Sequence, residues 1–425
     1  MQNNENNTKW FSLAGIWFGG IVSVPALLIG STLIASLSFY TSLLAGLVGF
    51  SFVVFFMALL SIASVEKRKS TVSLASSSFG KTGANIIVGL IIGMSTLAWF
   101  GIQSNIAGAS FSKIILESTD VDIPSWISSV FWGIIMVLTA VFGFKYLKWL
   151  NYIAVPAIVL LLIYGLVITF QNHSFLEISN YKPKESISLL KAIGLTIGFI
   201  SVGGVISPDY NRFAASKKDA ILGSIFGIIP SATLLLAIGA ILAITQNTYD
   251  IVEIFSSLGF PFFALTILIL ATWTSNVMNI YSSGLAFTNL LNLNESYRSK
   301  VTLVAGMAGI TLAALGIINH FIDFISLITI TITPIAGVII SDYFISKTYS
   351  ETEKKFNFKG VISWGFGVAV MLIMSSEIKY ILGILGAAAV YYLLQKLFIS
   401  KILEQDRPNL TNRPSEYELE NTSKN

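Results

Sequence analysis

The stretch SVGGVISPDYNR, residues 201 to 212, lies at the end of an apolar run long enough to cross a membrane, yet it contains two adjacent glycines, a proline and an aspartate. Glycine lowers helix stability by about 1 kcal/mol relative to alanine, and proline removes an N–H group and clashes with the carbonyl one turn back. In lipid the freed carbonyls need partners, so unwound backbone occurs only where it is buried in protein or lines a cavity. Gly203, Gly204 and Pro208 therefore predict a break in a membrane helix.

The rest of the chain is a succession of similar runs. Of its 425 residues 54% are hydrophobic and 11% are charged, whereas soluble domains carry about 25% charged residues. A membrane helix needs about 20 apolar residues. The sequence predicts an all-α polytopic membrane protein with twelve spans: 10 to 33, 41 to 65, 86 to 108, 127 to 145, 149 to 170, 192 to 211, 220 to 244, 257 to 286, 301 to 318, 320 to 345, 360 to 376 and 379 to 400.

Three weak matches at nearly one offset indicate an internal repeat. GGIVSVP (Gly19 to Pro25) in span one resembles GGVISP in span six, LAWFGIQSN in span three resembles ATWTSNVMN in span eight, and Pro156 and Pro334 lie centrally in spans five and ten. Because the repeated unit has five helices, an odd number, its second copy enters the membrane from the opposite side. Such inverted repeats with broken helices are typical of secondary transporters. Chance matches among 33 glycines and a kink that serves only packing are the alternatives.

The repeat and the charges divide the chain. We expect a first repeat over 10–170, a second over 192–345, spans eleven and twelve over 360–400, a cytoplasmic N-terminus over 1–9 and a disordered cytoplasmic tail over 403–425. With both termini in the cytoplasm, the loops of that side hold all but five of the 26 basic residues, as the excess of Lys and Arg in cytoplasmic loops requires. The five outside are Lys113, Lys182, Lys184, Lys191 and Lys379.

Polar side chains gather at helical spacing in spans three and eight. Thr96, Trp99 and Gln103 share one face of span three, as Thr274, Ser275 and Asn279 do in span eight, with Asn276 flanking. Hydroxyls and amides in a membrane point inward, to another helix or to a ligand. Aromatic faces beside neutral amides suit a flat, hydrogen-bonding solute, since stacking on an aromatic side chain contributes about 1 to 3 kcal/mol per base. Bonds between helices remain the alternative for each single hydroxyl.

Several classes of function are excluded or disfavoured. The chain has no cysteine and no sequence motif of a hydrolase, a metalloprotease or a nucleotide-binding domain, so we expect neither an enzyme nor an ATP-driven pump, and no cofactor. The basic residues are dispersed, which argues against nucleic acid. Carbonyls of Gly19 to Val22, freed by a break in span one, would suit a small hard cation that takes oxygen ligands. A channel would favour a continuous polar stripe and a sensor a soluble output domain, and the sequence shows neither feature.

Four stretches together resemble the purine and cytosine permease family, the bacterial branch of the nucleobase-cation symporters, and cytosine permease-like members in particular. They are LAWFG, GFISVGGVISPDYNRF, TWTSN with IYSSGLAFTNL, and ITPIAGVIISDYF. The resemblance covers nearly the whole chain. It implies twelve helices of the LeuT type, with a five-plus-five inverted repeat, discontinuous helices 1 and 6, alternating access, and a monomer in the cytoplasmic membrane.

The resemblance also implies a site. Trp99 and Phe199 would sandwich the substrate ring, with Gly198, Ser201 and Val202 along its edge and Asn276 nearby. A coupling Na+ would bind the Gly19 and Val22 carbonyls together with Ala271 and Thr274, and Ser275 would lie adjacent.

Two positions depart from the family pattern. Thr96 stands where cytosine permeases carry a glutamine that bonds the base, so purines, hydroxymethylpyrimidine or another small heterocycle are substrates as open as cytosine. Ala271 stands where they carry an asparagine that helps ligate sodium, so either Ser275 substitutes for it or the coupling ion is H+. We predict a nucleobase or heterocycle symporter driven by Na+ or H+, and the alternative is an amino-acid symporter of the same fold.

Asp209 follows the break in span six. A carboxylate at midplane could carry a proton, but Arg212, Lys217 and Lys218 come next, which places Asp209 near the cytoplasmic end, where a charge costs less than at the helix centre. We predict a structural or inner-gate ion pair with Arg212, and a coupling role is the alternative.

Overall fold

The computed structural model describes residues 8–142, 147–183, 185–350 and 354–405. Most of the predicted tail, and residues 1–7 of the predicted N-terminal segment, lie outside these ranges. Within them the chain forms helices and no named strand, with a single isolated bridge between Thr8 and Ala214. The all-helical prediction is therefore confirmed for the part of the chain that is described.

The helices follow the apolar runs of the sequence. Serines at the helix N-termini accept bonds from backbone amides and fix where several helices begin: Ser38 before α3, Ser188 before α9 and Ser216 before α11. The α-helices are α1 (Trp10–Ile21), α2 (Val24–Ile34), α3 (Phe39–Lys67), α4 (Thr71–Phe79), α5 (Lys81–Thr119), α6 (Ser125–Phe142), α7 (Leu147–Asn172), α8 (Phe175–Ser179), α9 (Leu189–Val205), α10 (Ser207–Asn211), α11 (Lys217–Gln246), α12 (Ile251–Ser256), α13 (Pro261–Leu290), α14 (Arg298–Ala314), α15 (Phe321–Ile340), α16 (Phe358–Ile373) and α17 (Lys379–Gln405).

Each of the twelve predicted spans overlaps a helix or a pair of helices, but the count of twelve is not confirmed. In the described ranges nine helices are long and apolar enough to cross a membrane, or ten if the bent pair α1 and α2 counts as one span. The helices α14 and α16 have 17 and 16 residues, somewhat short for the hydrocarbon thickness. The protein is a multi-pass membrane protein.

Both predicted breaks are present, in different forms. α1 ends at Ile21, Ser23 is extended, and α2 begins at Val24 with Pro25 in its first turn, so the chain bends by 62°. The second break is a single residue, Ile206, between the glycine pair that ends α9 and Pro208 in α10. The two pieces there continue as one 23-residue span, Leu189–Asn211, so the second break is the milder.

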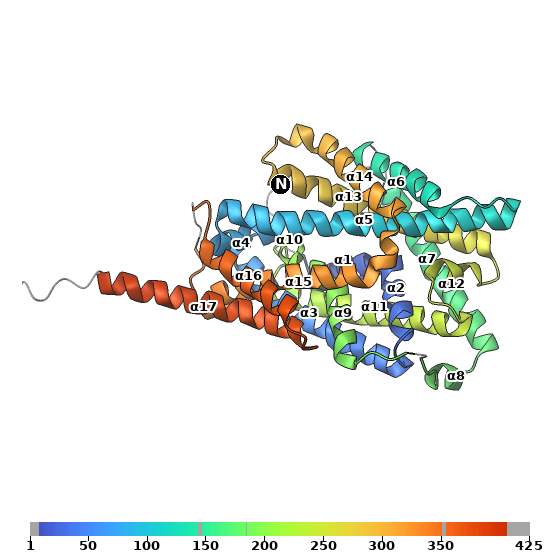
Figure 1. Ribbon diagram of the computed structural model, residues 1–425, viewed down its shortest axis with the longest axis horizontal. Helices are drawn as coiled ribbons and strands as arrows, with labels where there is room; N and C mark the ends of the chain where they lie inside the picture. The colour runs from blue at the N-terminus through green and yellow to red at the C-terminus, as the bar shows by residue number, and fades with distance from the viewer. Residues whose placement is uncertain (1–7, 143–146, 184, 351–353, 406–425) are drawn as a thin grey trace, which may run out of the picture.

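The packing repeats itself in the manner of an inverted repeat. α1 and α2 pack against α11, while α9 packs against α3; α5 lies along α13, and α6 against α14. Figure 1 shows α5 running across most of the body, and the short helices α4 and α12 each precede one of the long pair α5 and α13. The most buried spans are those of α9 and α15, whereas α6, α7 and α17 lie at the periphery.

Close backbone contact fixes α2 on α11. A Cβ on Gly239 of α11 would lie 2.2 Å from the Leu27 carbonyl oxygen, and a Cβ on Gly30 of α2 would lie 2.2 Å from the Leu236 carbonyl oxygen. Small residues at these crossings let membrane helices approach closely. The second half of the broken first helix is therefore held rigidly against α11.

We predict that Gly239→Ala lowers the free energy of unfolding by about 1 to 3 kcal/mol, because the added methyl group meets a backbone oxygen that no rotamer change can move. Gly89→Ala is the matched control, since a Cβ at Gly89 meets nothing within 4 Å. Thermal melting in detergent measures both. Equal melting temperatures for the two variants would contradict the close contact.

Candidate functional site

The predicted aromatic pair lies at the centre of the fold, where α5, α9 and α15 meet. Trp99 of α5 and Phe199 of α9 are both buried, and their ring centroids are 6.1 Å apart with the planes at 80°. Trp99 also contacts Phe321 and Phe324 of α15 edge to face, at 6.0 and 5.2 Å. The two predicted partners thus touch edge to face in this structure, and a flat ligand between them requires one ring to rotate.

Two polar residues lie one turn to either side of Trp99 and differ in the hydrogen-bonding groups that they leave available. The Thr96 hydroxyl donates to the carbonyls of Ile92 and Gly93 in its own helix, at 2.9 and 3.2 Å. The buried Gln103 side chain accepts a bond on Oε1 from the Ser275 hydroxyl of α13. Its amide nitrogen has no hydrogen-bond partner among the described residues, so Gln103 keeps two N–H donors for a ligand.

The α9 residues expected along the ring edge are buried next to Phe199. A Cβ on Gly198 would lie 2.2 Å from Thr329 Oγ1 of α15, so this glycine is required by the close approach of the two helices. The Ser201 hydroxyl donates to the Gly198 carbonyl at 2.9 Å, and the Val202 carbonyl accepts from the Ile206 amide at the break. The backbone and small side chains of α9 therefore form a wall beside the ring of Phe199.

Asn276 faces a different way from the aromatic pair. Its amide nitrogen donates to the Phe100 carbonyl and Ser104 Oγ of α5, both at 3.0 Å, and contacts Met136 Sδ of α6 at 3.1 Å. The side chain is fully buried. These bonds tie α13 to α5 and α6, so the amide nitrogen of Asn276 holds these helices together, and its place near a ligand stays a prediction.

The two halves of the predicted cation site have suitable chemistry but are not joined by a hydrogen bond in the described residues. The carbonyls of Gly19 to Val22 lie at the end of α1, so no N–H group of a following turn of that helix bonds to them. A Cβ at Gly19 would meet nothing within 4 Å. On α13 the Thr274 hydroxyl donates to the Ala271 carbonyl at 2.9 Å. Hydroxyls that donate their proton keep lone pairs for a cation, so this neutral oxygen set fits a hard monovalent ion.

Asp209 and Arg212 have separate partners. Asp209 Oδ1 accepts from the backbone amide of Thr71 at 2.8 Å, at the N-terminus of α4, where a carboxylate is stabilised. The Arg212 guanidinium lies 4.7 Å from the ring centroid of Phe213, and the ion pairs given by the described residues do not include Asp209 with Arg212. In this structure Asp209 therefore binds α4, and its predicted pairing with Arg212 stays a prediction.

Residues where α3 ends and α4 begins donate hydrogen bonds to carbonyls at the second break. The Thr71 hydroxyl donates to the Val205 carbonyl at 3.3 Å, at the end of α9. Arg68 Nη1 donates to the carbonyls of Arg212 and Ala214, at 2.7 and 2.8 Å. The carbonyls that follow the broken helix are thus satisfied by protein groups.

Sequence reasoning missed a network around Asn211. Asn211 is fully buried; its Oδ1 accepts from Trp17 Nε1 of α1 at 3.2 Å, and its Nδ2 donates to Ser61 Oγ of α3 and Ser224 Oγ of α11. The available signal was an asparagine at the end of a membrane span.

The nearby pocket of about 310 Å³, lined by Thr8, Leu13, Ile16, Tyr210 and Phe213, includes none of the residues expected to bind substrate.

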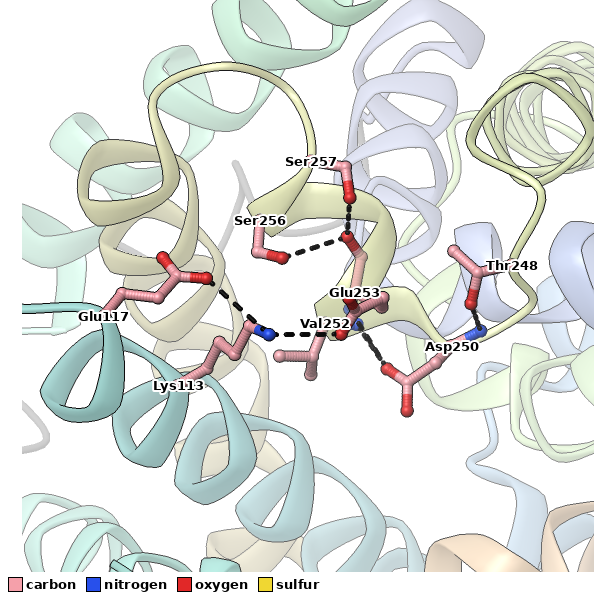
Figure 2. Close-up of polar contacts among 8 residues, drawn as sticks. All are labelled: Lys113, Glu117, Thr248, Asp250, Val252, Glu253, Ser256 and Ser257. Atoms are coloured by element: carbon pink, nitrogen blue, oxygen red, sulfur yellow. Dashed lines mark hydrogen bonds and ion pairs between the residues drawn. The ribbon is translucent and has the colours of Figure 1, made fainter. Parts of the chain in front are cut away.

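A polar cluster at the far end of α5 holds the short helix α12 (Figure 2). Asp250 caps α12 through the amides of Val252 and Glu253, and Lys113 bridges Glu117 and Glu253 at 3.7 and 3.4 Å. These charged side chains are partly exposed, so each pair contributes little to stability. The burial of Ile254 and Phe255 is what attaches α12 to the body.

We predict that Asn276→Ala lowers the free energy of unfolding by about 1 to 3 kcal/mol, because it leaves buried acceptors on α5 without a donor. Asn279→Ala is the control, since Asn279 makes one long bond of 3.4 Å to Asn276 Oδ1 and is only partly buried. Thermal melting compares the two. A ligand-binding role for Asn276 would appear instead as an unchanged melting temperature together with a lost response to ligand.

Comparison with solved structures supports the fold. The chain aligns with the inward-facing conformation of Mhp1 at a TM-score of 0.82, with 18% identity over 94% of both chains. A closed conformation of Mhp1 with bromovinylhydantoin bound gives 0.77, with 18% identity over 95% of this chain and 96% of that one. A Na+-coupled sialic acid symporter gives 0.62, with 12% identity over 92% and 90%. The fold is of the LeuT type, as predicted.

Sequence comparison gives the family. The chain is 28% identical to the cytosine permease of Escherichia coli over 79% of this chain and 75% of the relative, and 23% identical to the hydantoin permease of Microbacterium maritypicum over 86% and 78%. The allantoin permease of Bacillus subtilis is 24% identical over 92% and 90%. A family model described as permease for cytosine/purines, uracil, thiamine and allantoin matches residues 1–394. The protein therefore belongs to this family of permeases and is not an enzyme.

Proposed function

We propose that this permease is a secondary symporter that imports a nucleobase or a related small heterocycle across the cytoplasmic membrane, driven by a Na+ or H+ gradient. The substrates named for its relatives, cytosine, hydantoin and allantoin, all carry a ring with amide-like donors and acceptors. The protein works as a monomer, and both termini lie in the cytoplasm.

The observation that carries this proposal is the pairing of Trp99 with Gln103. The two side chains lie one helical turn apart on the same face of α5, so the amide donors of Gln103 would lie beside the aromatic ring. A flat heterocycle gains stacking energy on the ring and hydrogen bonds on its edge at one place. Phe199 of α9 lies across from Trp99, at 6.1 Å between centroids.

The coupling cation would bind between the broken first helix and α13. The Gly19 and Val22 carbonyls supply ligands from one side, and the hydroxyls of Thr274 and Ser275 supply them from the other. Ala271 has no ligating side-chain atom, but its carbonyl oxygen lies within hydrogen-bond distance of both hydroxyls, at 2.9 and 3.3 Å. A cation bound there would be the partner that the carbonyls freed by the break need in lipid.

Transport follows by alternating access. α1 packs against α11, and its glycine-rich end meets open space at Gly15, Gly19 and Gly20. Closure of α1 toward α13 would bring the two halves of the cation site together.

An amino-acid symporter of the same fold is the weaker alternative. A structure of MhsT in complex with L-phenylalanine shares the fold, with a TM-score of 0.58 and 13% identity. A zwitterion needs a partner for its ammonium and its carboxylate. Among the described residues, those that surround Trp99 and Phe199 are aromatic rings and neutral polar groups, which suit an uncharged ring.

Uptake into proteoliposomes tests the proposal. Labelled cytosine, adenine, uracil, hydroxymethylpyrimidine, hydantoin and allantoin are offered under imposed Na+ or H+ gradients. We expect accumulation of at least one heterocycle under one of the gradients, and loss of accumulation when the gradient is collapsed by an ionophore. Trp99→Ala, which removes the stacking surface, is expected to weaken binding by about 5- to 150-fold, equivalent to about 1 to 3 kcal/mol.

A panel of amino acids offered under the same gradients is the control. Accumulation of an amino acid with none of the heterocycles would overturn the proposed function. Unchanged substrate affinity in a folded Trp99→Ala protein would remove the stacking role while leaving the transport function in place.

A further inference from the structure

The Ser275 hydroxyl stands between the two proposed ligands. It donates to Gln103 Oε1 of the neighbouring helix α5, and the backbone carbonyls of Ala271 and Thr272 lie at 3.3 and 3.2 Å from the same oxygen. The hydroxyl has one proton and three acceptors within reach. Which acceptor receives the proton therefore depends on what else surrounds the oxygen.

The neighbouring Thr274 hydroxyl has no such choice. It donates to the Ala271 carbonyl, within its own helix, as serines and threonines in membrane helices commonly do. It makes no bond to Gln103 or to any other residue of α5 within the described part of the chain. Thr274 and Ser275 therefore offer similar oxygens to a cation, but only Ser275 also contacts the substrate side.

A cation on Ser275 Oγ would select among the three acceptors. Because it binds the lone pairs of the oxygen, it repels the hydroxyl proton and turns it away from the ion. It also polarises the O–H bond, and hydrogen bonds with a charged partner are stronger than neutral ones. With the proton on Gln103 Oε1, the carboxamide is fixed in one orientation and its N–H groups are directed to a ligand.

We propose that Ser275 is a positioning residue that couples the cation to the heterocycle through Gln103. Without a cation the Ser275 proton is shared among the three acceptors, so the bond that orients Gln103 is weaker. This inference rests on the proposed function, since it needs a cation on α13 and a heterocycle at Gln103. Coupling of this kind is reciprocal, so each ligand raises the affinity for the other by the same factor.

The test measures binding rather than transport. Purified full-length protein in detergent binds radiolabelled cytosine, or hydantoin or allantoin if cytosine does not bind, and the Kd is determined from zero to saturating NaCl with choline chloride as the replacement salt. For the unmodified protein we expect saturating Na+ to lower the Kd by a factor within the usual range of about 5 to 150. Size-exclusion profiles and melting temperatures establish that each variant is folded.

Four variants separate coupling from cation binding. Ser275→Ala and Gln103→Met are expected to reduce the Na+ effect on the Kd to less than about twofold, even at saturating Na+. Ser275→Thr, which keeps the hydroxyl, retains it. Thr274→Ala is the matched control: it raises the Na+ concentration needed for half the effect but preserves the full effect at saturation.

The outcomes that overturn the inference differ from those that overturn the function. A full Na+ effect in Ser275→Ala, an equal collapse in Thr274→Ala, or heterocycle binding to the unmodified protein without any Na+ effect would each refute the coupling role while leaving heterocycle recognition intact. Failure of every heterocycle to bind the unmodified protein would instead refute the proposed function.

Discussion

The absence of water in the hydrocarbon core is the constraint on which this structure depends, because every carbonyl freed by a broken helix must find a partner there. The second break meets it with protein groups: Thr71 binds the Val205 carbonyl, and Arg68 binds the carbonyls that follow α10. The first break, at Val22 and Ser23, bends the chain by 62°; there the Ser23 hydroxyl donates to the Ile21 carbonyl and the Ala26 amide donates to the Ser23 carbonyl. The two halves of an inverted repeat thus satisfy the freed carbonyls differently, and in the proposed function a cation serves those of the first break.

The other elements support this asymmetry. The glycines at the crossing of α2 and α11 hold the second half of the broken helix in place, while the first half, α1, is held on α11 and at Asn211 through Trp17. The long pair α5 and α13 carries the residues proposed to bind the substrate and the hydroxyls proposed to bind the cation. Asn276 and the Ser275 bond to Gln103 join these two helices. The residues proposed to bind the cation and the substrate thus lie on elements that contact each other directly.

Much of the fold follows from the sequence, because membrane helices are defined by length and apolarity, and breaks by glycine and proline. The repeat, both breaks and the helix overlapping each span were predictable in this way. Side-chain partners were less so. The apolar pattern does not say which helix a polar group faces, so the bond from Asn276 to the Phe100 carbonyl and the bond from the Thr71 amide at the start of α4 to Asp209 could not be predicted. Phe321 and Phe324 contact the Trp99 ring, and nothing in the sequence of their own span predicted these contacts.

An experimental structure with a bound heterocycle would test the central claim most directly. The protein would be imaged by cryo-electron microscopy at a saturating concentration of a transported heterocycle and of NaCl. The account predicts a ring stacked on Trp99 with its edge bonded to the Gln103 amide, and the Phe199 ring rotated from its present 80° toward parallel. A ligand bound elsewhere, such as in the pocket beside Tyr210 and Phe213, with the Trp99 and Phe199 rings still edge to face, would contradict it.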